Sequence, residues 1–344
     1  MPPKVSVIVP AYNSKNYIHA TLRSLLEQTV DDLEILVIDD GSTDGTADFA
    51  RCLLRSSNHT WQVVSQTNAG VSAARNHGLS VSTGQYLLFL DADDYLHPEC
   101  LSSLIQVMEY TGSDMAFCGH DAVTEDRALV QSYGNRYSYL SESASGVQSL
   151  VDVMRERILP WTGSTAYRRS FLDINGLKYT DGRTYAEDIE LTWTAMFRAG
   201  RVACVKRVLS FYVQHAGSTT GTAAMKRFQG LDVLFSLLDL FSREDHNNPA
   251  ATCLRTYRLP VDITGLFGAL AGKGIHIPKL LSILRQEPRY REALQRFWPD
   301  PEANLAARRA IQVRTFSHHP MAYLLACSAR ERFLKAVRVM RGNT

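Results

Sequence analysis

A run of apolar residues near position 90 ends in three carboxylates. Residues 86–94 read Tyr-Leu-Leu-Phe-Leu-Asp-Ala-Asp-Asp, which places Asp91, Asp93 and Asp94 directly after a stretch that favours a buried strand. Neighbouring carboxylates repel one another, so a bound cation or hydrogen-bond donors must offset their charge. Their hard oxygen atoms favour Mg²⁺ or Mn²⁺ over Zn²⁺ as that cation. A solvated surface loop is the alternative for this segment taken alone.

Two further polar segments follow apolar runs in the same way. Residues 10–13 read Pro-Ala-Tyr-Asn and follow the run at 5–9, and residues 39–44 read Asp-Asp-Gly-Ser-Thr-Asp and follow the run at 33–38. Taken alone, the second segment is also typical of a turn with a helix cap. The three segments together are harder to explain by local structure, and they indicate a binding site.

The elements that must position these segments alternate between strands and helices. Short apolar runs predict strands at residues 5–9, 33–38, 61–64, 87–90 and 115–118. Between them, apolar residues recur at helical spacing, as at Ile18, Leu22 and Leu25. Continuous apolar strands separated by helices predict an α/β fold with a mostly parallel sheet covered on both faces. Because ligands bind beyond the carboxyl ends of such strands, we expect the three polar segments at one edge of the sheet.

Composition and charge argue against several classes of protein. The 344 residues are 45% hydrophobic and 21% charged, as in an ordinary globular protein. The formal net charge of +2 is too close to zero to indicate a polyanion-binding surface over the whole chain, so no nucleic-acid partner is expected. The six cysteines stand singly, without a C-x-x-C pair, which argues against a disulfide framework or a zinc site.

The expected localisation rests on the N-terminus and on hydropathy. Met-Pro-Pro-Lys leads directly into the first apolar run, and no apolar stretch reaches the roughly 18–20 residues that cross a bilayer. We therefore expect a soluble cytoplasmic protein. Peripheral contact with the inner face of the plasma membrane stays open, because residues 308–341 hold eight Lys and Arg against one acid, Glu331. A solvated face, or packing on the rest of the protein, is the alternative for that basic segment.

Four blocks of the sequence, in this order and at this spacing, resemble glycosyltransferase family 2. The blocks are Val-Ser-Val-Ile-Val-Pro-Ala-Tyr-Asn (5–13), Val-Ile-Asp-Asp-Gly-Ser-Thr-Asp (37–44), Asn-Ala-Gly (68–70) with Ala-Arg-Asn-His-Gly (74–78), and Phe-Leu-Asp-Ala-Asp-Asp (89–94). The resemblance covers roughly residues 4–220. It implies the GT-A fold, with a mostly parallel sheet sandwiched by helices, and an inverting enzyme that uses a nucleotide-diphospho-sugar donor.

The resemblance also suggests how the chain is divided. We expect a GT-A catalytic domain at residues 1–222 and a helical C-terminal domain or extension at residues 223–344, where apolar residues recur at helical spacing. The implied partners are a UDP-sugar and a hydroxyl acceptor on a glycan, a cell-surface polysaccharide or a lipid-linked precursor. Oligomerisation is left open.

The first two blocks resemble the part of the family that holds the nucleotide base. Pro10, Ala11 and Tyr12 would line the base, with the ring of Tyr12 available for stacking. Asp40 would accept a hydrogen bond from the imide N–H of uracil, and Asp39 would help to shape that loop. These roles are what the resemblance implies.

The next two blocks would hold the diphosphate and its cation. Asn68 and Arg75 lie where the family closes over the base and the diphosphate, and a guanidinium fork suits phosphate oxygens. Asp91, Ala92 and Asp93 resemble the family's D-x-D motif. In that motif Asp91 would reach the ribose or the sugar, and Asp93 would bind the divalent ion, Mn²⁺ or Mg²⁺, that bridges the two phosphates. Asp91 is a second candidate ligand for this ion.

A second acidic pair would supply the base that the reaction needs. Attack of a hydroxyl on an anomeric carbon requires a base on the face opposite the departing diphosphate. Glu187 and Asp188 precede a helical pattern and resemble the family's Glu-Asp motif. Asp188 would remove the acceptor proton, and Glu187 would contact the acceptor. The alternative is that both residues only complement a helix N-terminus.

The last segment that fits the family is Tyr-Val-Gln-His-Ala-Gly-Ser at residues 212–218. It resembles a Tyr-x-x-His-x-x-Ser stretch whose histidine approaches the metal or the diphosphate. His215 would then be a metal ligand, and Ser218 would contact the nucleotide-sugar. A histidine with an ordinary structural role after a strand is the alternative.

Other classes of protein fit the sequence less well. A dinucleotide-dependent oxidoreductase needs a G-x-G-x-x-G loop after the first strand, and a nucleotidyltransferase normally carries a glycine-rich basic loop there, whereas this chain has Pro-Ala-Tyr-Asn. A non-catalytic nucleotide-sugar-binding protein would not require Asp188. A processive polysaccharide synthase would show membrane spans and a Gln-x-x-Arg-Trp signature, which this sequence does not contain.

Overall fold

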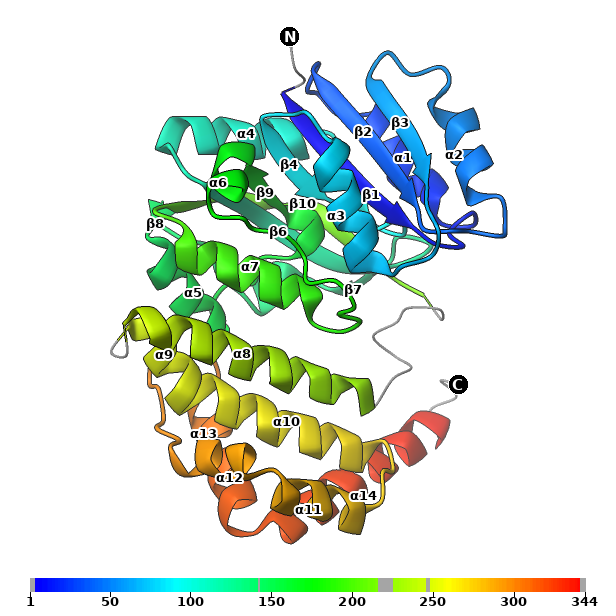
Figure 1. The fold of residues 1–344 in the computed structure, drawn as a ribbon. Helices are drawn as coiled ribbons and strands as arrows, with labels where there is room; N and C mark the ends of the chain where they lie inside the picture. Colours follow the sequence, from blue (N-terminus) through cyan, green and yellow to red (C-terminus); the bar gives the residue numbers. More distant parts are fainter. Residues whose placement is uncertain (1–3, 142, 216–224, 246–247, 341–344) are drawn as a thin grey trace. The chain divides into compact units, whose positions relative to one another are not determined.

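The computed structural model describes residues 4–141, 143–215, 225–245 and 248–340 (Figure 1). The chain divides into two compact units, Met1–Ser218 and Thr219–Thr344. The first is an α/β unit, which runs from blue to green in Figure 1, and the second is a helical unit, which runs from yellow-green to red.

A ten-stranded sheet forms the centre of the described part of the α/β unit. Its strands are β1 (Val5–Ala11), β2 (Leu33–Asp39), β3 (Thr60–Ser65), β4 (Tyr86–Phe89), β5 (Tyr95–Leu96), β6 (Met115–Thr124), β7 (Leu129–Gln131), β8 (Ser143–Ala144), β9 (Thr165–Arg168) and β10 (Val202–Gln214). The order is β3-β2-β1-β4-β9-β6-β10-β5, with β7 paired to β6 and β8 to β10. Strands β1 to β4 are parallel to one another, as are β6 and β10, whereas β9 is antiparallel to both of its neighbours.

Helices follow most of these strands. They are α1 (Ile18–Leu26), α2 (Thr46–Leu54), α3 (Val71–Val81), α4 (Cys100–Thr111), α5 (Gly146–Met154), α6 (Arg169–Ile174) and α7 (Glu187–Arg198), with short 3₁₀ segments at Tyr133–Asn135 and Thr162–Ser164. The prediction of an α/β fold with a mostly parallel sheet is confirmed.

Alternation along β1 explains how helices cover both faces of the sheet. Val7 and Val9 belong to the buried core that also contains Leu22 of α1. Ile8 points to the opposite face, because successive side chains of a strand alternate. There it meets α3 so closely that a Cβ on Gly78 would lie 2.3 Å from Ile8 Cγ2. A glycine at position 78 therefore sets the distance at which α3 packs on the sheet.

The helical unit is built around α10 (Leu259–Gly272). Its other helices are α8 (Phe228–Glu244), α9 (Pro249–Cys253), α11 (Ile277–Gln286), α12 (Pro288–Gln295), α13 (Ala306–His318) and α14 (Pro320–Met340), with a 3₁₀ turn at Met225–Arg227 and a π-helical turn at Leu254–Arg258. Phe267 of α10 is fully buried, and its ring lies 5.6 Å from that of Phe228 and 5.5 Å from that of Phe316. The helical character expected for the C-terminal region is confirmed.

Hydropathy does not single out a transmembrane helix. Among the helices of the described ranges, none combines the length and the apolar character that a membrane span requires.

Candidate functional site

The carboxyl ends of the parallel strands bring the polar segments to one edge of the sheet. Asp39, the last residue of β2, pairs in register with Ala11 of β1, and Asp40 N–H donates to Ala11 O at 2.8 Å. The β4 segment continues alongside, since Leu90 N–H donates to Ile8 O at 3.0 Å. Residues 12–13, 39–44 and 91–94 therefore leave the sheet at the same edge.

The two aspartates after β2 have different surroundings. Both Asp39 and Asp40 are buried. The Asp40 carboxylate accepts hydrogen bonds from Gln66 Nε2 at 2.8 Å and from the backbone N–H groups of Ala69 at 2.9 Å and Gly70 at 2.8 Å. Asp39 Oδ1 accepts from Ser42 N–H at 3.2 Å. A carboxylate offers about four acceptor positions, so most of those on Asp40 are used to hold the loop before α3.

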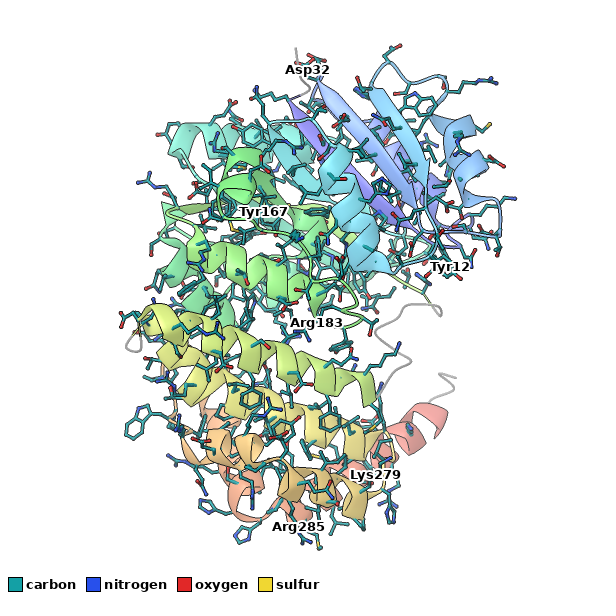
Figure 2. The ribbon with its side chains drawn as sticks, viewed as in Figure 1. Tyr12, Asp32, Tyr167, Arg183, Lys279 and Arg285 are labelled. Carbon is teal, nitrogen blue, oxygen red and sulfur yellow. The ribbon has the colours of Figure 1, made fainter. Side chains whose placement is uncertain are left out.

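The segment after β1 presents one exposed aromatic ring. Pro10 and Ala11 are buried within the strand, whereas Tyr12 is 53% exposed and lies at this edge (Figure 2). Asn13 fixes the backbone there: its Oδ1 accepts from Thr43 N–H and its N–H donates to Ser42 Oγ, both at 2.9 Å. Its φ of 49° lies in the left-handed region, which asparagine tolerates better than most residues.

Arg75 of α3 connects the two acidic motifs. Its side chain is 3% exposed, and its Nη2 donates to Asp91 Oδ1 at 2.7 Å while its Nη1 donates to Glu187 Oε1 at 3.1 Å. Its guanidinium also lies over the ring of Tyr179, 4.9 Å from the ring centroid. Burial alone would lower the pKa of Arg75. The nearby Asp91, Tyr179 and Glu187 outweigh this effect, so the pKa is raised. The guanidinium of Arg75 thus holds the D-x-D motif beside the Glu-Asp motif.

The three carboxylates after β4 have three separate partners. Asp91 is bound by Arg75, and Asp93 Oδ2 lies 2.8 Å from His215 Nε2. Asp94 is 1% exposed, and its Oδ1 accepts from Val213 N–H at 3.0 Å. Burial, together with the charge of Asp93, raises the pKa of Asp94 well above its ordinary value. Burial and the charge of Asp91 likewise raise the pKa of Asp93.

Asp93 and His215 form the part of the site that suits a cation. The His215 side chain is buried against Tyr17, whose ring is stacked 4.3 Å away, and this contact orients the imidazole toward Asp93. No group of three or more His, Cys, Asp or Glu side chains suitable for a metal occurs among the residues that the structure describes. Mg²⁺ is commonly bound through one or two carboxylates and completes its shell with water and substrate phosphates, so the carboxylate of Asp93 fits such an ion. The nitrogen of His215 is a softer ligand, which suits Mn²⁺ better than Mg²⁺. Ser218 lies outside the described residues.

The second acidic motif stands at the N-terminus of α7. Glu187 and Asp188 are the first two residues of this helix, after Ala186 in the left-handed region with φ 62°. Asp188 Oδ1 accepts from Ile189 N–H at 2.8 Å. Burial raises the pKa of Asp188 to about 6, with the charge of Glu187 adding to the rise and Arg75 opposing it. A carboxylate with this pKa is suited to accept a proton near neutral pH.

Several residues of the site were not assigned from the sequence. Trp161 Nε1 lies 3.5 Å from Asp94 Oδ2, and its ring is 5.8 Å from that of His120 and 5.2 Å from that of Tyr212. Burial lowers the pKa of His120 to about 4. Its position two residues after the strand predicted at residues 115–118 is the signal that could have identified it. Two residues that were assigned from the sequence also lie at this edge of the sheet. Asn68 is exposed in the loop that Asp40 holds, and Ala92 is buried between Asp91 and Asp93.

Comparisons with known proteins agree with this arrangement. Residues 6–172 match the model of the family described as Glycosyl transferase family 2. Among curated proteins, the chain is similar to the uncharacterized glycosyltransferase YibD of Escherichia coli K12, at 31% identity over 227 residues that cover 63% of each chain. The chain thus spans a little under two thirds of that relative.

Two solved structures share the fold over nearly the whole chain. One is S. aureus TarS 1–349 in complex with UDP-GlcNAc, with a TM-score of 0.62 and 21% identity over 98% of this chain and 92% of that chain. The other is the mannosyltransferase PcManGT from Pyrobaculum calidifontis in complex with GDP-Man and Mn²⁺, with a TM-score of 0.56 and 20% identity over 97% and 88%. The family match covers residues 6–172, a little under half of the chain. The two structures show that the chain has the GT-A fold.

Proposed function

We propose that this glycosyltransferase moves a sugar from a UDP-sugar to a hydroxyl acceptor by a single displacement with inversion, and that Asp188 is the base. The observation that carries the proposal is the bridge made by Arg75. It holds Asp91 on the donor side and Glu187 on the acceptor side within one salt-bridged group. Asp188, next to Glu187, has the raised pKa of about 6 that suits a base.

The donor nucleotide would lie at the edge formed by β1 and β2. Tyr12 is exposed for stacking on the base, and Pro10 and Ala11 would form the floor of this site. Asp39 is the better partner for the base, because most acceptor positions of Asp40 are used by Gln66, Ala69 and Gly70. Asp40 would then act by shaping the loop that carries Asn68, so the roles first expected of the two aspartates are exchanged in this proposal.

The diphosphate would lie beside Asp93 and His215, which are 2.8 Å apart. Asp93 and His215 would hold Mn²⁺ or Mg²⁺, which would neutralise the charge that develops on the leaving diphosphate. Asp91 would contact the ribose or the sugar with the oxygen that Arg75 does not bind. PcManGT, which shares the fold, is described as a complex with GDP-Man and Mn²⁺, and this supports a divalent ion and a nucleotide-sugar as ligands of the fold.

The transfer step can be written from the residues of the chain. The acceptor O–H gives its proton to a carboxylate oxygen of Asp188 as the acceptor oxygen attacks the anomeric carbon. The new C–O bond forms on the face opposite the bond that breaks, and UDP departs with the bonding electron pair. Glu187 would position the acceptor, and Arg75 would keep Glu187 and Asp91 in register during the reaction.

The acceptor and the location are proposed at the level of class. We propose that the acceptor is a hydroxyl of a glycan, of a cell-surface polysaccharide or of a lipid-linked precursor. The reaction would take place in the cytoplasm. A nucleic-acid partner does not suit the α/β unit, because residues 1–218 hold 25 Asp and Glu against 18 Lys and Arg. A nucleotidyltransferase, or a non-catalytic nucleotide-sugar-binding protein, is not favoured as an alternative.

A donor screen that measures released UDP tests the proposal. The wild type is compared with Asp188→Asn and Asp93→Ala, and the exposed Asp173→Asn on α6 serves as the control. We expect Asp188→Asn to bind UDP with Mn²⁺ but to lose transfer, and Asp93→Ala to weaken the Mn²⁺-dependent binding of UDP itself. Transfer at the normal rate by Asp188→Asn would refute the assignment of the base.

A further inference from the structure

The helical unit carries a strong positive charge that the composition of the whole chain conceals. Residues 219–344 hold 19 Lys and Arg against 10 Asp and Glu, whereas residues 1–218 hold 18 against 25. A charge asymmetry of this kind between two parts of a chain suggests that the basic part meets an anionic partner. The charge is therefore a property of the helical unit and not of the transferase site.

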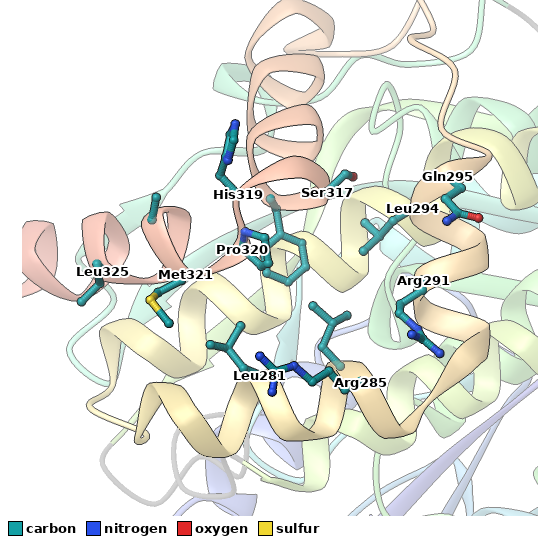
Figure 3. A pocket seen from close by; sticks show the side chains of 13 residues that line it. Leu281, Arg285, Arg291, Leu294, Gln295, Ser317, His319, Pro320, Met321 and Leu325 are labelled. Atoms are coloured by element: carbon teal, nitrogen blue, oxygen red, sulfur yellow. The ribbon is translucent and has the colours of Figure 1, made fainter.

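A pocket of about 590 Å³ lies within the same unit, among α11, α12, α13 and α14 (Figure 3). This volume is within the range of sites that bind small molecules. Its apolar wall consists of Leu281, Leu284, Leu294, Phe316, Met321 and Leu325. The apolar surface continues outward, because Met321 is 55% exposed and Leu325, one turn further along α14, is 50% exposed. Neither exposed side chain is needed to fill the core of the unit.

Two arginines line this pocket together with the apolar residues. Arg285 comes from α11 and Arg291 from α12. No ion pair of either guanidinium is recorded among the described residues, and no acidic residue lines the pocket. The neighbouring arginines differ: Arg289 pairs with Glu287 and Asp232, and Arg296 pairs with Glu292. Within the part of the chain that the structure describes, two cations without an ion-pair partner thus stand beside an apolar wall.

We propose that this pocket binds an anionic lipid at a membrane surface. The hydrocarbon chain would lie against the leucines and Phe316, and the phosphate would contact Arg285 and Arg291, whose planar guanidinium groups match phosphate oxygens. A second copy of the chain is a poorer occupant. In a symmetric dimer the same patch meets itself, which would bring the unpaired arginines of one copy against those of the other. This proposal does not depend on the proposed transferase chemistry.

Flotation of the full chain with vesicles tests the proposal. We expect the wild type to float with phosphatidylcholine vesicles that contain phosphatidylglycerol, and not with phosphatidylcholine alone. Arg285→Glu/Arg291→Glu should lower the partition coefficient by about tenfold or more, because each cation near an anionic surface contributes to binding. Met321→Ser/Leu325→Ser, at exposed positions, should lower it as well.

A matched variant separates the pocket from the general charge of the unit. Lys279→Glu/Arg308→Glu makes the same change in charge at exposed positions outside the pocket, and Lys279 lies on the same helix as Arg285 (Figure 2). We expect it to lower the partition coefficient much less. An equal loss in both double variants would overturn the pocket as the binding site. Thermal unfolding followed by circular dichroism shows that each variant is folded, whether or not it transfers sugar.

A soluble probe distinguishes a lipid from phosphate alone. Calorimetric titration with dodecyl phosphate should show saturable binding that Arg285→Glu/Arg291→Glu removes, whereas inorganic phosphate and dodecyl maltoside should bind far more weakly. If inorganic phosphate binds as tightly as dodecyl phosphate, the proposal that the ligand is a lipid is overturned. Sedimentation without vesicles tests whether a second copy of the chain occupies the pocket instead. If the wild type is a dimer and Arg285→Glu/Arg291→Glu is a monomer, the pocket is an interface between copies and the lipid proposal is overturned.

Discussion

At the scale of single residues, the protonation of Asp188 gives the most direct prediction. Burial and the charge of Glu187 raise its pKa to about 6. The proposed base acts as the carboxylate, so we expect kcat/KM to fall as the pH drops through about 6. Glu187→Gln removes a charge that raises this pKa and leaves Arg75, which lowers it. The acid limb of a pH–rate profile should therefore move to lower pH in Glu187→Gln, and an unchanged limb would contradict the assignment.

Arg75 is the residue whose loss should affect both halves of the site. Arg75→Ala leaves Asp91 and Glu187 without their shared cation. Removing one partner of a buried ion pair costs about 3–5 kcal/mol, so we expect a large drop in the free energy of unfolding in urea together with the loss of transfer. Arg75→Lys keeps the charge, but its single amino group cannot replace the two guanidinium nitrogens that bind Asp91 and Glu187. The activity of this variant should therefore stay low.

An exposed pair provides the comparison for Arg75. Arg23 and Glu27 form an ion pair on the surface of α1, with more than half of each side chain exposed. Surface pairs of this kind contribute about 0–1 kcal/mol. Arg23→Ala should therefore leave both stability and transfer nearly unchanged. Similar losses in Arg23→Ala and Arg75→Ala would contradict the special role of the buried bridge.

At the scale of elements, Asp94 ties the end of β10 to the D-x-D loop. Its bond from Val213 N–H holds the strand two residues before His215, which lies against Asp93. Asp94→Ala leaves a buried N–H unpaired, at a cost of about 1–3 kcal/mol, and frees the segment that carries His215. We expect the Mn²⁺ concentration needed for half-maximal UDP binding to rise. Asp94→Asn retains an acceptor oxygen and should show a smaller effect, and equal effects would contradict a positioning role.

The sequence predicted regular elements well where the pattern was simple. The runs at residues 5–9, 33–38, 61–64 and 87–90 correspond to β1 to β4, because each is a short, mainly apolar stretch that a helical pattern follows. The antiparallel strand β9 was not predicted. Its four residues, Thr-Ala-Tyr-Arg, are too few to show a period, and its place between β4 and β6 depends on pairing with residues far away in the chain.

The site was predictable in composition but not in its contacts. Spacing and resemblance picked out Asp91, Asp93 and Asp188, yet the sequence contains no sign that Arg75 pairs with a residue 112 positions later. The same holds for Asp40, whose donors Ala69 and Gly70 follow the next strand. Local patterns report which residues are polar and where a strand ends, whereas these bonds depend on how α3 and its loop pack on the sheet.

At the scale of the whole molecule, each of the two units has a core of its own, and this gives a prediction about unfolding. The proposed nucleotide site lies entirely within Met1–Ser218. A ligand stabilises only the unit that binds it, by an amount set by its concentration relative to its Kd. In scanning calorimetry we expect two transitions, of which UDP with Mn²⁺ raises one. Phe267→Ala, which removes a fully buried ring from α10 at a cost of about 3–5 kcal/mol, should lower the other. A single transition that both UDP and Phe267→Ala shift as a whole would show that the units unfold together, and the proposed boundary near residue 222 would then mark no independent domain.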